Sequence, residues 1–143
     1  MAYDVQVVID CSEPHPLADW WAAALGWQVE PSDEGFIRKM IAEGYATEDD
    51  TTTHRGVLVW RTAAAINHPA GRDGGRPRIL FQQVPEPKTV KNRVHLDVRA
   101  GDDRERLLER LVAAGATVDH RGSEGPNEWV TIRDPEGNEL CLD

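Results

Sequence analysis

The sequence is short of cysteine, of basic residues and of long apolar runs. Its 143 residues include two cysteines, too few for a disulfide framework, which favours reduced thiols and a cytoplasmic location. No segment has the apolar length of a membrane span, and the first ten residues lack the features of a signal peptide. Because 16 Lys and Arg stand against 25 Asp and Glu, the net charge of -9 argues against nucleic acid as a partner.

One pattern occurs twice along the chain. In each half a β-branched strand is followed by apolar residues at helical spacing, a glycine that ends the helix, and three more strands. The predicted strands and helices are 5–11, 14–25, 27–31, 56–62 and 78–84 in the first half, and 93–99, 102–114, 116–120, 128–134 and 138–143 in the second. The unit is therefore βαβββ, and the fold class is α+β, with mixed curved sheets and helices outside.

The repeat predicts a single domain, 1–143, made of two modules. The first module is 1–84, the linker is 85–92, and the second module is 93–143. An insertion at 34–54 interrupts the first module and is expected to hold a strand or short helix followed by a polar loop. Residues 67–77, rich in Gly, Pro and Arg, are predicted to form a long surface loop. Asp102 and Glu105 resemble a capping box at the start of the second helix.

Two registers relate the first strands of the modules. Gln6 lies 20 residues before Gly26 and His95 lies 20 residues before Gly115, which makes Gln6 and His95 equivalent. A second register sets Val8 opposite His95. Because side chains alternate between faces every two residues, both registers point the same face inward.

Three segments carry a resemblance to a known family: VVIDCSEPHPLADWWAAALGW, RILFQQVPEPKTVKNRVHLDV and the closing DPEGNELC. Together with the two βαβββ modules, they resemble the vicinal oxygen chelate superfamily, and most closely its glyoxalase-like branch common in actinobacteria. That superfamily includes glyoxalase I, extradiol dioxygenases and the bleomycin- and fosfomycin-resistance proteins. The resemblance implies that the modules' sheets enclose a central cleft.

The resemblance also implies which residues face that cleft. Metal-binding members take a ligand from the first and last strand of each module, and the matching positions here are Gln6, Gln82, His95 and Cys141, with Gln83 as the alternative to Gln82. Such members usually end in DPDGN-x-x-E, whose glutamate is the last ligand. In this sequence the residue four positions after Gly137 is Cys141.

These four residues include one imidazole, one thiol and two neutral amides. Zinc sites usually have at least three strong ligands, so the ligand count favours a cleft without metal. The alternative is zinc or nickel held by the His/Cys pair. His95 is also a candidate general base, and it is the neighbour that would activate Cys141 as a nucleophile. A hydrogen-bonded interior histidine and a packed thiol are the structural alternatives.

Other side chains also have both a functional and a structural interpretation. Trp60 and Trp129 fall on predicted strands and are expected either to line the pocket or to fill the core. His54 and Arg55 are either pocket-rim groups for an anionic ligand or solvated loop charges, and the second interpretation is favoured. Cys11 alternates with Asp10, so it is expected to face the helix.

The function expected from these observations is metal-free binding of a small organic molecule in the cleft, as in resistance proteins that sequester drugs. The alternatives are a divalent-metal lyase, isomerase or dioxygenase of the glyoxalase type, and a metal-free enzyme with His95 as its base. The resemblance implies a homodimer. The net charge and the lack of a long apolar run predict that neither nucleic acid nor a membrane is a partner.

Overall fold

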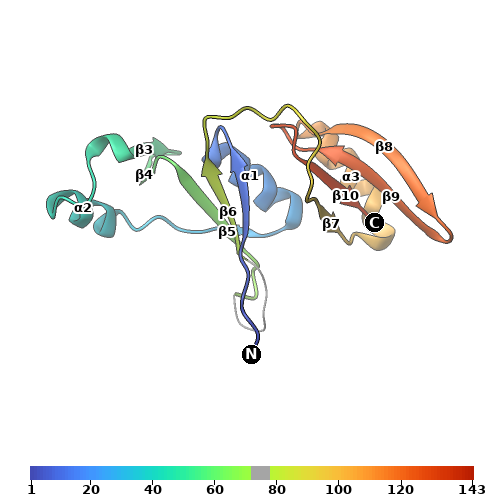
Figure 1. The fold of residues 1–143 in the computed structure, drawn as a ribbon, viewed down its shortest axis with the longest axis horizontal. Helices are drawn as coiled ribbons and strands as arrows, with labels where there is room; N and C mark the ends of the chain where they lie inside the picture. Colours follow the sequence, from blue (N-terminus) through green and yellow to red (C-terminus); the bar gives the residue numbers. More distant parts are fainter. Residues whose placement is uncertain (72–77) are drawn as a thin grey trace. The chain divides into compact units, whose positions relative to one another are not determined.

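The computed structural model describes residues 1–71 and 78–143, and the chain divides into two compact units, Met1–Pro85 and Glu86–Asp143 (Figure 1). Each unit mixes helices with strands, which confirms the predicted α+β class. The elements are β1 (Val7–Cys11), α1 (Pro14–Leu25), β2 (Gln28–Val29), α2 (Glu34–Ala42), η1 (Glu48–Asp50), β3 (Thr51–His54), β4 (Val57–Trp60), β5 (Ala63–Asn67), β6 (Arg78–Gln83), β7 (Leu96–Val98), η2 (Gly101–Asp103), α3 (Arg104–Ala113), β8 (Thr117–Glu124), β9 (Asn127–Arg133) and β10 (Glu139–Leu142).

The predicted repeat is visible in the order of the strands. Unit 1 has a four-stranded sheet in the order β1-β6-β5-β2, and unit 2 has one in the order β7-β10-β9-β8. In both sheets the first pair is parallel and the other pairs are antiparallel. Each sheet is therefore one βαβββ module, with β5 and β6 of unit 1 corresponding to β9 and β10 of unit 2.

The prediction for 56–62 is right about a strand but wrong about its place. β4 leaves the module sheet and pairs with β3 in a separate two-stranded sheet, across a turn at Arg55 and Gly56. The third strand of the module is instead β5, whose sequence AAAIN falls between the predicted strands. Alanine has a low strand propensity, so the strongly β-branched VLVW masked the true strand. The segment between β2 and β5 thus contains α2, η1, β3 and β4.

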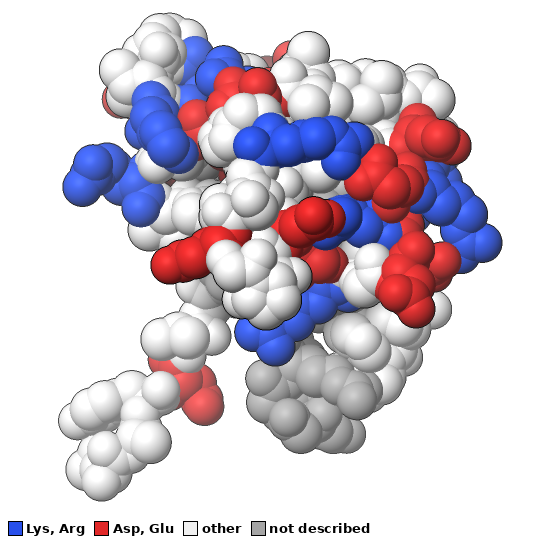
Figure 2. Space-filling view, turned by 90° about the vertical axis from the view of Figure 1, so that its right-hand side faces the viewer, with Lys and Arg blue, Asp and Glu red and all other residues white. Residues whose placement is uncertain are grey.

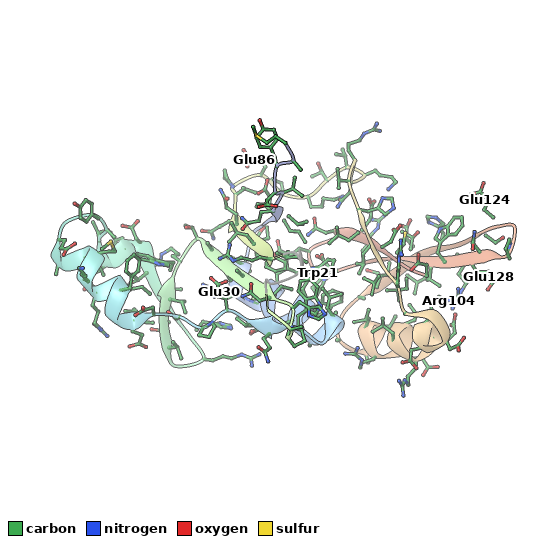
Figure 3. The ribbon with its side chains drawn as sticks, turned by 90° about the horizontal axis from the view of Figure 1, so that it is seen from below. Trp21, Glu30, Glu86, Arg104, Glu124 and Glu128 are labelled. Atoms are coloured by element: carbon green, nitrogen blue, oxygen red, sulfur yellow. The ribbon has the colours of Figure 1, made fainter. Side chains whose placement is uncertain are left out.

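The core of unit 1 lies between α1 and the sheet. Helix α1 begins with Pro14 in its first turn and ends at Gly26, whose φ of 67° is left-handed as the sequence predicted. Trp21 is 1 % exposed and lies 6.4 Å, centroid to centroid, from Phe81 of β6 (Figure 3). Cys11 is buried with them, which confirms that it faces the helix.

The core of unit 2 uses the apolar face of β10. Leu140 and Leu142 are fully buried, together with Leu108 and Leu111 of α3. The predicted capping box at 102–105 is wrong: the N-cap is Asp103, which makes no side-chain cap bond, because 101–103 forms a 3₁₀ turn. Glu105 instead binds Arg121 through two 2.8 Å hydrogen bonds.

The DPEGN motif forms the turn that leads into β10. The carboxylate of Asp134 accepts hydrogen bonds of 2.9 Å from the backbone N–H groups of Glu136 and Asn138, and Gly137 adopts a φ of 88°. Because Asp134 is 2 % exposed, these bonds satisfy a buried carboxyl group and hold the turn. The motif therefore sets where the last strand begins.

The described helices and the visible surface have two further features. None of the helices in 1–71 and 78–143 has the length and apolar character that crossing a bilayer requires. On the face shown in Figure 2, acidic and basic side chains are interspersed. In unit 2, acidic and basic side chains form ion pairs with one another, such as Arg104–Glu128 and Arg133–Asp119.

Candidate functional site

The sheet of unit 2 brings three chemically strong side chains together. In the strand ladder Cys141 lies opposite Asp97 of β7 on one side and Thr131 of β9 on the other. His95 precedes Asp97 by two residues and therefore shares its face, because side chains alternate along a strand. One possible ligand atom from each of His95, Asp97 and Cys141 lies within 4.8 Å of the other two. These three residues are called the His–Asp–Cys cluster below.

The members of the cluster differ in exposure. The side chains of His95 and Asp97 are 45 % and 55 % exposed, whereas Cys141 is 8 % exposed. His95 Nε2 lies 3.4 Å from Asp97 Oδ1. The expected proximity of His95 and Cys141 is thus confirmed. Asp97 was missed as a site residue, although the spacing of His95 and Asp97 in HLD places both on one face of a strand.

A line of polar groups leads from Cys141 to the opposite edge of the sheet. Thr131 Oγ1 lies 3.3 Å from Cys141 Sγ and 3.4 Å from His120 Nε2. His120 Nδ1 lies 2.9 Å from Asp119 Oδ2. Hydrogen bonding from His120, together with Arg133, holds the pKa of Asp119 below its usual range. The Thr131 hydroxyl therefore lies within hydrogen-bonding distance of Cys141 on one side and close to His120 on the other.

His120 is another residue that sequence reasoning missed. The pairing of β8 with β9 shifts register between Val118 and His120, so that His120 lies opposite Thr131. A β-bulge re-aims side chains in this way, and no residue pattern in ATVDH predicts one. The bulge is the reason why His120, on the edge strand β8, lies opposite Thr131 of β9.

A cavity of about 760 Å³ adjoins the cluster in unit 2. Its wall includes Asp97 and Cys141, together with Trp129, which is one of the predicted pocket residues. Arg104 and Glu128, joined by a 3.0 Å hydrogen bond, form another part of the wall (Figure 3). The cavity has the size of a small-molecule site.

Gly122 explains the position of Trp129. The two residues are paired in the ladder of β8 and β9, and the indole ring occupies the space where a side chain at Gly122 would be. A glycine opposite a large aromatic residue is a known way to seat the ring on the sheet. Trp129 is thereby held at the wall of the cavity.

The corresponding face of unit 1 has different side chains. Asp10 lies opposite Gln82, as Asp97 lies opposite Cys141, and the position that matches His95 is then Val8. This is the second of the two registers considered from the sequence. Gln6 lies before β1, where its Oε1 accepts a 3.1 Å hydrogen bond from Arg78 Nη1.

Gln6 and Gln82 are separated along the sheet of unit 1. Gln82 pairs with Asp10, four residues beyond Gln6, which corresponds to roughly 13 Å along a strand. The two amides therefore lie apart along the sheet, and the amide oxygen of Gln6 is hydrogen bonded to Arg78. Gln83, the alternative to Gln82, donates its side-chain N–H to the carbonyl of Ser12 at 3.0 Å.

Trp60, His54 and Arg55 lie in a second cavity, of about 470 Å³, within unit 1. Trp60 lies at the end of β4, and its carbonyl oxygen is 2.7 Å from His15 Nε2. His54 and Arg55 both contact Asp19 Oδ2, at 2.7 and 3.0 Å. His54 is therefore a cavity group with a 26 % exposed side chain, whereas Arg55 lines the cavity with a side chain that is 75 % exposed, as expected for a solvated loop charge.

The donors of the His–Asp–Cys cluster fit a zinc ion. Imidazole, carboxylate and thiolate are all ordinary zinc ligands, and catalytic zinc sites use three protein ligands with one open position. Two ligands roughly 2 Å from a tetrahedral ion lie about 3.3 Å apart, which is close to the separation of His95 Nε2 and Asp97 Oδ1. The thiol disfavours magnesium and calcium, which prefer oxygen ligands.

Comparison with known proteins agrees with the fold. Residues 6–142 match the family described as a glyoxalase-like domain, so the chain belongs to that family. No curated protein sequence matches it. Structural neighbours belong to the same glyoxalase/bleomycin resistance/dioxygenase superfamily, as the sequence resemblance predicted.

Three solved structures illustrate the likeness. A hypothetical protein, SA1046, from S. aureus has 12 % identity and a TM-score of 0.63, with 99 % of this chain and 93 % of that chain covered. A mutant of the fosfomycin resistance protein FosX from Listeria monocytogenes, complexed with Mn(II) and dihydroxypropylphosphonic acid, has 8 % identity and a TM-score of 0.64. The match covers 99 % of this chain and 91 % of that chain. A glyoxalase/bleomycin resistance protein/dioxygenase family enzyme from Burkholderia phytofirmans has 17 % identity and a TM-score of 0.59, with 98 % of this chain and 97 % of that chain covered.

Proposed function

We propose that this glyoxalase-like protein binds a small organic molecule in the unit 2 cavity, with a divalent ion on the His–Asp–Cys cluster as its anchor. The observation that carries the proposal is the convergence of three strong donor atoms within 4.8 Å of one another. Two of them, on Asp97 and Cys141, belong to residues in the wall of a 760 Å³ cavity. An ion held there would supply a Lewis acid that polarises an oxygen of the bound molecule.

The residues of the chain have distinct parts in this proposal. His95, Asp97 and Cys141 would hold the ion, and the Thr131 hydroxyl would donate to the thiolate from 3.3 Å. Trp129 offers an apolar wall, and Arg99 and Arg104 offer cationic groups at the cavity. The FosX neighbour with bound Mn(II) supports a metal in this superfamily, and the thiol here favours zinc over manganese.

The test is elemental analysis of protein purified without a metal-binding tag, followed by zinc titration against a chelator. We expect one equivalent of zinc, and its loss in the variants His95→Ala, Asp97→Asn and Cys141→Ser. Asp10→Asn is the matched control, because Asp10 occupies the corresponding position in unit 1. A protein that neither contains nor takes up zinc would overturn the proposal, as would full zinc retention in Asp97→Asn.

A second candidate function is binding without metal, favoured by the 3.4 Å contact of His95 with Asp97. Each of these groups then has a partner of its own, and His95 stands as a base beside the cavity. Ligand binding or turnover that survives chelators and is lost in His95→Ala would favour this candidate. The homodimer and the cytoplasmic location stay predictions.

A further inference from the structure

We infer that unit 1 contains a second small-molecule site, which takes an uncharged phenolic compound whose hydroxyl donates to His54 or His15. The site is the 470 Å³ cavity beside the hairpin β3–β4. Its lining combines that hairpin, which lies outside the βαβββ repeat, with residues of β5 and β6, and it shares no residue with the His–Asp–Cys cluster.

The cavity is preformed because the hairpin is fixed to its surroundings by hydrogen bonds. Ser32 Oγ donates to the carbonyl of Leu58, and the N–H of Leu58 donates to Glu34 Oε1 at 2.9 Å. The turn of the hairpin places Arg55 at a φ of 49°, a left-handed conformation that is costly for a residue with a side chain. In this conformation His54 and Arg55 both reach Asp19 of α1.

The hydrogen bonds of the two histidines fix their tautomers. His54 Nε2 lies 2.7 Å from the Asp19 carboxylate, and His15 Nε2 lies 2.7 Å from the carbonyl of Trp60. Because a carboxylate and a carbonyl only accept, both Nε2 atoms carry the hydrogen. Nδ1 is then the nitrogen of each ring left to accept a hydrogen bond, and none of the hydrogen bonds in the described part of the chain uses it. The rings are stacked, with centroids 5.2 Å apart and an interplanar angle of 28°.

The charged groups of the cavity are paired with one another. Its described lining carries two cations, Arg55 and Arg78, and two carboxylates, Asp19 and Glu30. They are paired within the site: Arg55 with Asp19 at 3.0 Å and Arg78 with Glu30 at 2.8 Å. Glu30 is labelled beside the strands of this sheet in Figure 3. A ligand that enters need not bring a charge.

The remaining lining residues indicate which shape of ligand the cavity accepts. Val57, Val59 and Leu80 give an apolar wall, and Trp60 adds an aromatic one. An apolar cavity with aromatic side chains and two acceptor nitrogens suits a planar ring that bears a hydrogen-bond donor. A phenol has this combination, and it is un-ionised at neutral pH, since the phenolic pKa is about 10.

The test is calorimetric titration of the full chain with 4-methylphenol and with 4-methylanisole, which has the same ring but no donor. We expect 4-methylphenol to bind about tenfold more tightly, the value of one hydrogen bond. The variants His54→Phe and His15→Phe keep the ring volume and should weaken 4-methylphenol toward 4-methylanisole. His68→Phe is the matched control, because His68 belongs to unit 1 but contacts Trp27 outside the cavity.

Three results would overturn the inference: no binding of 4-methylphenol by the unsubstituted chain, equal binding of the two probes, or unchanged affinity in both histidine variants. The comparison of the two probes needs no substitution, so it stands even if a variant unfolds. Circular dichroism of each variant identifies that case. Zinc content should be unchanged in His54→Phe, which separates this site from the proposed metal site of unit 2.

Discussion

The two modules share a backbone plan but differ in the chemistry of one face. Their sheets have the same strand order and the same parallel first pair. Where unit 2 has His95, Asp97 and Cys141, the matching ladder positions of unit 1 are Val8, Asp10 and Gln82. The difference shows that the repeat fixes where side chains meet, whereas single substitutions decide whether the side chains at these positions are strong ligand donors.

The modules also differ in how their polar groups are supplied. Unit 2 draws its cluster from the strands of the repeat itself. In unit 1 His54 and Arg55 come from an additional hairpin, and they meet Asp19 of α1. An insertion has thus given one module a set of side chains that the repeat does not provide.

The largest expected effect comes from transferring the cluster to the other module. The double variant Val8→His, Gln82→Cys would place an imidazole and a thiol beside Asp10 in unit 1. Because these three positions are laid out as in unit 2, we expect the variant to bind a second equivalent of zinc. At a micromolar Kd its binding free energy would be about 8 kcal/mol.

The measurement for the transfer is zinc stoichiometry by elemental analysis and chelator competition. Val8→His alone is the control, since a histidine and one carboxylate are too few ligands. A double variant that still binds a single zinc would show that the ladders do not make these positions equivalent in geometry.

The second effect concerns the two cores. Phe81 in unit 1 and Leu140 in unit 2 are both fully buried on the helix side of their sheets. Truncation leaves a cavity, so we expect Phe81→Ala to cost about 3–5 kcal/mol and Leu140→Ala about 2–5 kcal/mol. Urea unfolding measures both. Val8→Ala, on the exposed face, should change stability by less than about 0.5 kcal/mol, and a comparable loss there would contradict the assignment of faces.

The third effect is at Glu139, whose ladder counterpart in unit 1 is Leu80. Glu139 is 5 % exposed and accepts from Lys91 Nζ at 3.0 Å and from the N–H of Asn92 at 2.8 Å. Burial disfavours its charged form, yet these bonds hold the pKa of Glu139 below its usual range. We expect Glu139→Gln to destabilise the protein by about 1.5–3 kcal/mol, measured by urea unfolding at neutral pH. Glu124→Gln, at an exposed carboxylate, is the control, and equal losses would refute a special role for Glu139.

The smallest effect concerns an exposed ion pair. Hydrogen bonding from Arg121 lowers the pKa of Glu105 to about 2, from 4.5. Because the pKa of Glu105 is lowered in the folded state, the stabilisation from its pairing with Arg121 is fully present above pH 4.5. It is lost as the pH falls through the folded-state pKa of about 2. We expect the pKa of Glu105 to rise in Arg121→Gln, though not fully because Arg104 remains. The carboxyl chemical shift measures it, Arg133→Gln should leave it unchanged, and no rise in Arg121→Gln would count against this pairing.

Much of the architecture could be predicted from local signals. The α1 helix lies where apolar spacing and Gly26 placed it, and the turn before β10 follows the DPEGN motif. β5 could not be predicted in this way, because three alanines have no strand signal of their own and form a strand only by pairing with β6. The cluster was predicted in two of its three members, His95 and Cys141. Asp97 was overlooked even though the strand period alone places it beside His95.

The sequence by itself determined the repeat, the family and the face on which His95 and Cys141 lie, because strand and helix periods are local properties of the chain. Only the tertiary structure decided which residues meet across strands. The bulge that brings His120 to Thr131, and the hairpin that brings His54 to Asp19, join residues 11 and 35 positions apart. Such pairings depend on register and on packing between elements, and neither is encoded in the pattern of a single segment.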